Sequence, residues 1–368
     1  MFWAVAAAVA ALLLWAVPAA AGTADDMLNR LDLAPLADWS AREDAGVDVR
    51  ALLSALIKGE AEWDLRKAGE VVKALMLSEL RAALDTLKTL LVPALIWAAL
   101  AAAAPPSSGA TGTMTLVCVL TVSVKLLALY ERLLPVARGA LASIAALGEL
   151  LYPLLAALLV AAGKAAGAAL FTPAAAMAGG LITGAVARWV LPLTGLVAAL
   201  TIAGHLSARM SLSALTSLVR KGVTLGLSAG LTLFTAMVSA QGLLSKGYDG
   251  ASIEAARFAA NSLVPVIGGE LADSLDAVVA SAHLLRGALG VTGILLLAGA
   301  LARPLVVIAM HAVAVRLAAA LAEPLAAGPV QQLIERFAGV LSLLLAAVVA
   351  GAVLIVTLIG ASLTVFGG

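Results

Sequence analysis

The chain has 368 residues, of which 63% are hydrophobic and only 12% are charged, and its formal net charge is +1. A soluble domain of this length carries about 25% charged residues, so the composition excludes an ordinary soluble protein and indicates a membrane protein. The small net charge gives no reason to expect nucleic acid as a partner. Cys118 is the only cysteine, which excludes an intramolecular disulfide and a thiolate metal site.

The first segment, residues 1–21, reads MFWAVAAAVAALLLWAVPAAA. An apolar core that ends in small residues is typical of a cleavable signal peptide, although this segment lacks the usual Lys or Arg near its start. We therefore predict a signal peptide over 1–21 and a mature chain that begins at Gly22. A retained anchor helix is the alternative. Both interpretations place residues 22–88 on the non-cytoplasmic side of the membrane.

The next region, residues 22–88, holds 13 acidic and 9 basic residues and is predicted to form short exported amphipathic helices. Asp48 is placed to cap a helix that Gly59 ends. A longer helix should begin near Asp64, and its apolar positions follow helical spacing. We interpret one stripe on it as a candidate docking surface for another protein, made of Leu65, Val72, Leu75 and Met76. Packing of these helices on themselves, or on the lipid interface, is the alternative.

The remainder, residues 89–368, is predicted to be a polytopic transmembrane domain of all-α class with about seven spans. Candidate spans lie at 88–104, 113–130, 150–163, 168–187, 189–204, 223–243, 287–302, 304–322 and 339–362. The stretch 150–163 is too short to cross alone and is expected to be re-entrant or tilted. Amphipathic stretches at 207–222, 249–262 and 328–338 are expected to lie in the headgroup plane.

An internal repeat is suggested by the spacing of prolines. Pro153 and Pro265 are 112 residues apart, and Pro192 and Pro304 repeat the same step. The repeat units would be about 150–243 and 262–362. Copies that cross the membrane an odd number of times would be inverted, as in many transporters.

The richest polar pattern in the apolar domain is acidic. On a helix, Glu270, Asp273 and Asp276 share about a third of the circumference, and His283 follows two turns later on the same side. Carboxylates are costly in lipid unless they face water or a partner. These four residues are candidates for a polar pathway or a partner contact. The alternative is a solvated interfacial helix.

Two further charges fall in or beside predicted spans. Lys125 lies inside 113–130 and Glu149 precedes Tyr152. Each is a candidate intramembrane charge. Lys125 could pair with Glu149 or Glu131, or its ammonium could extend to the interface.

The chain carries no nucleotide-binding, metalloprotease or hydrolase motif, and its three histidines are far apart. We therefore predict that it is not an enzyme and that it has no catalytic residues, metal site or cofactor.

Several short strings in fixed order resemble one known family. They are ALLSALIKGE at 51–60, LFTAMVSAQG at 233–242, LVPVIGG at 263–269, GALGVTG at 287–293 and AAALAEP at 318–324. Together they resemble stage III sporulation protein AE of endospore-forming bacteria, over nearly the whole chain.

The resemblance implies a component of the channel complex that joins mother cell and forespore, in the outer forespore membrane. Besides membrane lipids, the implied partners are the other proteins of the same operon, including a secretion-type ATPase and ring-forming proteins. No catalytic residue is implied. A stand-alone secondary transporter, and a passive membrane scaffold for a ring assembly, are the alternatives.

Overall fold

The computed structural model describes residues 21–45, 47–60, 65–103, 109–206, 212–263, 268–324 and 328–364, in some stretches for the backbone alone. All regular structure within these residues is helical, which confirms the predicted all-α class. Residues 1–20, which hold most of the predicted signal peptide, lie outside them. The helices are α2 (Ala21–Arg30), α3 (Ala34–Arg42), α4 (Val49–Lys58), α5 (Leu65–Ala103), α6 (Gly109–Ala161), α7 (Ala165–Gly180), the π-helical η1 (Leu181–Val190), α8 (Leu191–Leu206), α9 (Ser213–Leu263), α10 (Gly268–Ala322) and α11 (Pro329–Thr364).

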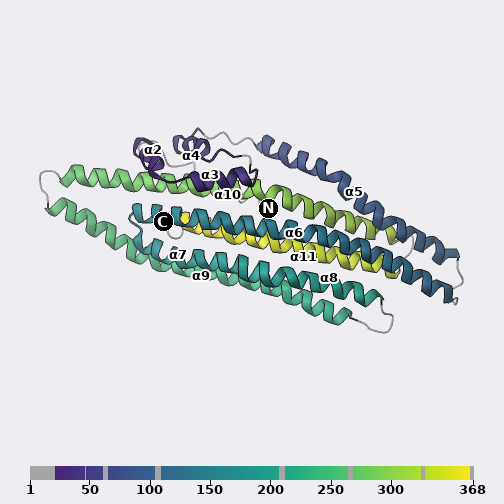
Figure 1. The fold of residues 1–368 in the computed structure, drawn as a ribbon. Helices are drawn as coiled ribbons and strands as arrows, with labels where there is room; N and C mark the ends of the chain where they lie inside the picture. The colour runs from purple at the N-terminus through teal and green to yellow at the C-terminus, as the bar shows by residue number, and fades with distance from the viewer. Residues whose placement is uncertain are drawn as a thin grey trace.

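Six helical rods in the described part of the chain are long and apolar enough to cross a membrane. They are α5, α6, the continuous rod of α7, η1 and α8, then α9, α10 and α11. Successive rods run in opposite directions and pack side by side into one elongated bundle (Figure 1). The chain is therefore a polytopic helical membrane protein, with six candidate spans where the sequence predicted about seven.

The difference in count arises because adjacent predicted spans join into single helices. The stretches 113–130 and 150–163 both belong to α6, and 287–302 and 304–322 both belong to α10. Pro153 and Pro304 lie inside these helices without ending them, as neighbouring helices in a membrane bundle permit. In the described residues, the predicted amphipathic stretches likewise belong to the ends of longer helices: 213–222 and 249–262 to α9, and 329–338 to α11. Residues 207–211 lie outside the described residues.

These helices are much longer than a membrane is thick. α6 has 53 residues and α10 has 55, so each measures about 80 Å at 1.5 Å per residue. The hydrocarbon core of a bilayer is only about 30 Å thick. A large part of each helix therefore extends beyond the hydrocarbon.

The core of the bundle is built around α11, which has buried residues along nearly its full length. Two glycines allow neighbouring helices to approach closely. A Cβ on Gly351 of α11 would lie 2.7 Å from a methyl carbon of Leu141 in α6, and one on Gly293 of α10 would lie 2.6 Å from a methyl carbon of Leu151. Small residues at such contacts are the usual means of tight packing between membrane helices.

The three short helices α2, α3 and α4 form a unit that we call the N-terminal cap. The Asp48 side chain accepts a hydrogen bond of 3.1 Å from the Ala51 N–H, and Gly59 ends α4 with φ of 71°, so both predicted capping residues are confirmed. The cap packs on α10 and α6. Ser143 of α6 donates a 2.7 Å hydrogen bond to the Glu43 carboxylate, and the Ala45 backbone lies against Gly299 of α10.

α5 runs without interruption through residue 88, where the sequence placed a domain boundary. The proposed repeat units share one direction. The rod of α7 to α8 and the helix α10 run the same way in Figure 1, and each is followed by an antiparallel helix, α9 or α11. A duplication here would therefore be parallel rather than inverted.

Candidate functional site

The bundle interior contains polar side chains, and many of them belong to α10. Among the described residues ten polar or charged ones are buried, and four of these lie on α10: Ser281, Arg286, Thr292 and His311. Arg286 is only 4% exposed and His311 is fully buried. Ionisable groups inside a membrane bundle are costly, and they usually mark a pathway or a partner contact. α10 is therefore the first candidate for a functional element.

Arg286 belongs to a group of cationic and imidazole side chains near one end of the bundle. Its Nη2 atom lies 2.9 Å from Nδ1 of His283, one turn earlier on α10. Lys164, in the turn between α6 and α7, is half-buried and close enough to His283 to act on it electrostatically. Three basic residues from two elements thus meet where α6 turns into α7. We call Lys164, His283 and Arg286 the turn cluster.

The predicted acidic residues precede this cluster on the same helix. Glu270, Asp273 and Asp276 lie in the first three turns of α10, where the structure describes the backbone but not the side chains. The helical backbone provides the spacing on which the prediction rested, with Asp276 two turns before His283. The preceding Pro265 lies outside the described residues.

The candidate intramembrane charges do not come together. Lys125 and Glu149 both lie on α6 with exposed side chains, and the 24 residues between them correspond to about 36 Å along one helix. The suggested pair between them is therefore wrong, because one continuous helix holds the two groups apart.

The predicted docking stripe lies on α5, which packs along α10. Val72 and Leu75 are half-buried and Met76 is exposed, whereas the side chain of Leu65 lies outside the described residues. Part of the stripe thus belongs to the side of α5 that meets its own bundle. Farther along α5, the stripe continues with Ala83, Leu90 and Ala94, which are buried.

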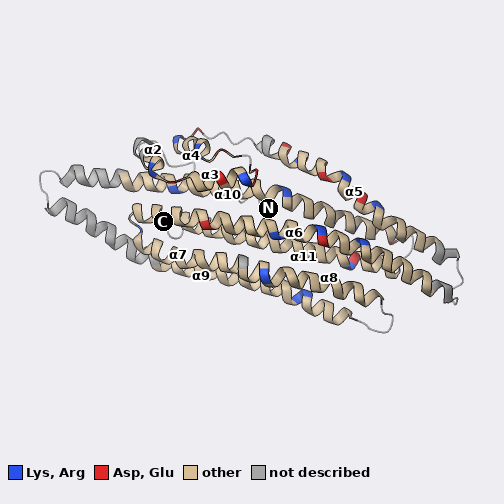
Figure 2. Ribbon diagram, in the orientation of Figure 1, with Lys and Arg blue, Asp and Glu red and all other residues tan. Residues whose placement is uncertain are grey.

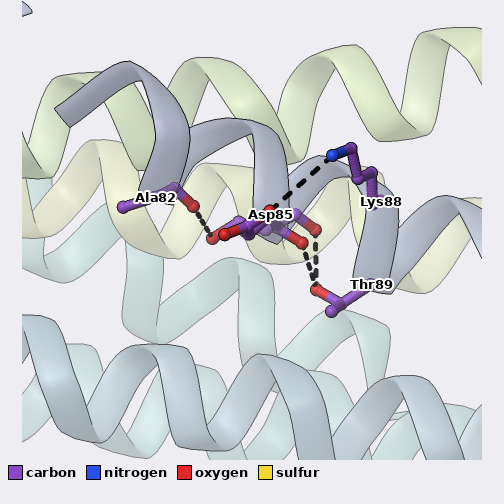
Figure 3. Close-up of polar contacts among 5 residues, drawn as sticks. Ala82, Asp85, Lys88 and Thr89 are labelled. Atoms are coloured by element: carbon purple, nitrogen blue, oxygen red, sulfur yellow. Dashed lines mark hydrogen bonds and ion pairs between the residues drawn. The ribbon is translucent and has the colours of Figure 1, made fainter. Parts of the chain in front are cut away.

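The outer side of α5 is charged. It carries Glu70, Lys73, Arg81, Asp85 and Lys88, all exposed. The ammonium nitrogen of Lys88 lies 3.8 Å from a carboxylate oxygen of Asp85 (Figure 3), and such an exposed pair contributes little to stability. Figure 2 shows charges along α5 and the cap, whereas the described part of α9 is almost free of them.

α9 presents the opposite chemistry. Between Gly222 and Ser245 its sequence contains no charged residue, and large apolar side chains such as Leu225, Leu233 and Leu243 are exposed. Hydroxyl groups on this helix, including Thr224 and Thr232, donate to backbone carbonyls of the preceding turn. A hydroxyl that donates its hydrogen bond within its own helix needs no partner outside it, and this suits a helix that faces lipid. The bundle thus has a charged side and an apolar side.

A feature that the sequence alone does not reveal is a set of basic residues on four helices at one level of the bundle. The guanidinium of Arg220 in α9 lies against Gly339 of α11. Nη2 of Arg316 in α10 donates a 2.9 Å hydrogen bond to Ser342 Oγ, and Ser342 is within one turn of Gly339 on α11. α6 runs parallel to α11, and the contact of Leu141 with Gly351 places Arg132 level with Ser342. We call the following residues the basic belt: Arg132, Arg220, Lys221, Arg316 and Arg336.

All belt residues are exposed, and they come from four helices. The acidic residues nearest to them in sequence are Glu131 and Glu335, so on these four helices the basic residues outnumber the acidic ones beside them. The sequence contained each charge, but only the helix register reveals that they share one level. A belt of exposed Arg and Lys around apolar helices is characteristic of a membrane–water interface.

Metal-binding geometry is not found in the described part of the chain, where no three His, Cys, Asp or Glu side chains gather. The lone Cys118 is buried there. The chemistry that remains is electrostatic: buried cationic groups on α10, a charged α5 and a basic belt.

Comparison with known proteins gives one family. A family model described as stage III sporulation protein AE matches residues 47–365, which include every helix from α4 to α11. The chain is 32% identical over 183 residues to the stage III sporulation protein AE of Bacillus subtilis (strain 168), an alignment that covers 49% of this chain and 45% of that protein. The match therefore spans about half the length of this curated relative. No solved structure matches the chain.

Proposed function

Since this chain belongs to the stage III sporulation protein AE family and is a multi-pass membrane protein, we propose that it is a membrane-embedded component of the channel complex between mother cell and forespore. In this role it supports development of the forespore by transport or feeding, without catalysis of its own. The relative's name and the family description identify a sporulation protein, and the channel role is our extension.

The observation that carries this proposal is the buried Arg286 on α10, held beside His283 in the turn cluster. A guanidinium inside an apolar bundle is costly, and such residues persist where they serve a pathway or a partner. The charged outer side of α5 supports the same conclusion, because a side rich in charge is unsuited to lipid and suited to water or to other subunits.

We propose that the basic belt faces the mother-cell cytoplasm. Exposed Lys and Arg gather on the cytoplasmic side of membrane proteins, and the belt holds five of them. The turn between α6 and α7 at Lys164 then faces the opposite compartment, consistent with an exported N-terminal region. A cysteine in place of Lys164, in a Cys118→Ser background, should react with a membrane-impermeant thiol reagent that is applied to the non-cytoplasmic side of the membrane.

The proposed partners are other proteins of the sporulation operon, including the secretion-type ATPase and the ring-forming proteins implied by the family. The basic belt would offer partners a contact surface on the cytoplasmic side of the membrane, and the charged exported region would offer another on the opposite side. The two-sided bundle favours assembly with other subunits over a stand-alone secondary transporter.

The test compares two arginines of the same helix in the host organism. Arg286→Gln removes the buried charge, and Arg303→Gln removes an exposed one. We expect Arg286→Gln to lower expression of a late forespore reporter at least tenfold at normal protein abundance, with Arg286→Lys partly restoring it. Arg303→Gln should behave like the parent.

Other outcomes distinguish the alternatives. Normal reporter expression in Arg286→Gln would remove the basis of the proposal. Solute uptake by the purified chain alone in proteoliposomes would favour a transporter. Loss of partner assembly in a deletion strain, together with full function of Arg286→Gln, would favour a passive scaffold.

A further inference from the structure

An apolar groove of about 250 Å³ lies between η1, α9 and α11. All of its lining residues are apolar or glycine, and they include Leu181 and Trp189 of η1, Gly226 of α9, and Leu354 of α11. The groove is separate from the turn cluster and from the N-terminal cap, since no residue of either contributes to its lining.

The groove exists because two unusual backbone features face one another. Gly222, Gly226 and Gly230 of α9 repeat every four residues and line it, and nothing lies within 4 Å of the position where a Cβ would stand on any of them. Opposite them, ten residues of η1 adopt the wider π-helical form. This form is rare in proteins, and where it occurs it is often at a functional site. Glycine stripes usually pack against another helix, but here the stripe faces open space.

One end of the groove is basic and carries an indole. Gly222 follows directly after the belt residues Arg220 and Lys221, and Trp189, which is 68% exposed, follows Arg188. Figure 2 shows the basic segments of η1 and of α9 at a similar position along the bundle. From Gly222 onward α9 has no charge for 24 residues. The groove therefore leads from a positive rim into an apolar region.

We propose that this groove binds an anionic phospholipid, with its phosphate at Arg188 and Lys221 and an acyl chain along the glycines of α9. From Gly222 to Gly230 the groove follows α9 for about 12 Å, close to the depth of one leaflet, about 15 Å of hydrocarbon. Exposed Trp residues locate at the headgroup level, and basic pockets between membrane helices on the cytoplasmic side bind anionic headgroups.

Charge argues against a second copy of the chain as the occupant. A copy aligned in the same membrane would bring its own basic belt to the same level, and like charges at an interface oppose association. A phosphate neutralises the rim instead. The proposal does not depend on the channel role, because it concerns lipid recognition by the helices themselves, but it does rest on the proposed cytoplasmic orientation of the basic belt.

The experiment measures lipid contact at Trp189 directly. A variant that keeps Trp189 and carries Phe at the other five tryptophans is placed in phosphatidylcholine vesicles that contain 20% of a lipid with brominated acyl chains. Bromine quenches nearby indole fluorescence. We expect brominated phosphatidylglycerol to quench at least threefold more than brominated phosphatidylcholine at the same content.

Two variants and two matched controls locate the effect. Gly226→Leu fills the groove, and Arg188→Gln with Lys221→Gln removes the rim charge; each should abolish the preference for phosphatidylglycerol. Gly139→Leu and Lys125→Gln alter an open glycine and an exposed lysine of α6, and they should preserve it.

Three results would overturn the proposal. The first is equal quenching by the two lipids in the parent protein. The second is an unchanged preference in both groove variants. The third is a change of oligomeric state in Gly226→Leu without a change in quenching, which would assign the groove to a second copy. Should Gly226→Leu fail to insert, the rim variant alone decides.

Discussion

Replacing Gly299 with alanine tests how the N-terminal cap is held on the bundle. Gly299 lies on α10 where the chain between α3 and α4 crosses it, and a Cβ there would stand 2.5 Å from the Ala45 carbonyl oxygen. Ordinary contact begins near 3.4 Å, so the Ala45 backbone would have to retreat by about 0.9 Å. The Ala45 atoms at this contact belong to the backbone, so no flexible side chain can move aside to make room for the new methyl group.

The size of the effect follows from the cost of overpacking. Such insertions cost about 1–3 kcal/mol, which corresponds to a change of about 5–150-fold in an equilibrium constant. The cap is also held by the hydrogen bond from Ser143 to Glu43 and by buried residues such as Leu36 and Leu53. The cost should therefore appear as easier opening of the cap while the bundle itself stays intact.

Hydrogen exchange of the detergent-purified protein measures this opening. Amides of α3 and α4 should exchange about 5–150 times faster in Gly299→Ala, and those of α11 should keep their protection. Gly139→Ala is the control, because a Cβ on this exposed residue of α6 meets nothing. Unchanged protection of α3 and α4 in Gly299→Ala would show that the cap does not rest on α10 at Ala45.

Three further predictions concern the sequence-based hypotheses. Mass spectrometry of membrane-purified protein should find Gly22 as the first residue, because signal peptidase favours small residues before its cleavage site; an intact Met1 would identify an anchor helix. Leu75→Asp puts a carboxylate on the half-buried side of α5 and should lower spore yield at least tenfold while membrane insertion persists. Parental behaviour of this variant in both assays would show that the stripe is not a docking surface. Asp273→Asn combined with Asp276→Asn should impair forespore development at normal abundance; full function would leave these acids without a role, and lost abundance would indicate a folding role.

Local sequence signals predicted local structure well. The ends of α4 follow from one side-chain cap and one glycine, and both Asp48 and Gly59 act as expected. The number of rods was harder to predict, because Pro304 separates two predicted spans and the charged residues Glu131 and Arg132 directly follow another. A proline ends a helix when its lost hydrogen bond is costly, and packing within a bundle reduces that cost.

The candidate sites show the same difference between features that one segment determines and features that depend on how the helices pack. The spacing of Glu270, Asp273 and Asp276 on a helix was foreseeable, since it depends on one element alone. The level shared by Arg220 and Arg316 depends on the register of α9, α10 and α11, and no single segment encodes it. Lys164 lies in the turn between α6 and α7, and only the folded chain reveals that this turn brings it close to the partly buried His283.

The length of the helices has a consequence for how the protein meets its surroundings. Exposed apolar side chains occur on both sides of the basic belt: Leu120 lies about 18 Å before Arg132 on α6, and Leu243 lies about 35 Å beyond Arg220 on α9. The two zones together span about 53 Å, more than the 40–45 Å of a whole bilayer with its headgroups. Acyl chains cannot cover both. One zone must be sheltered by other protein, so the isolated chain should bind excess detergent or aggregate until that protein is supplied.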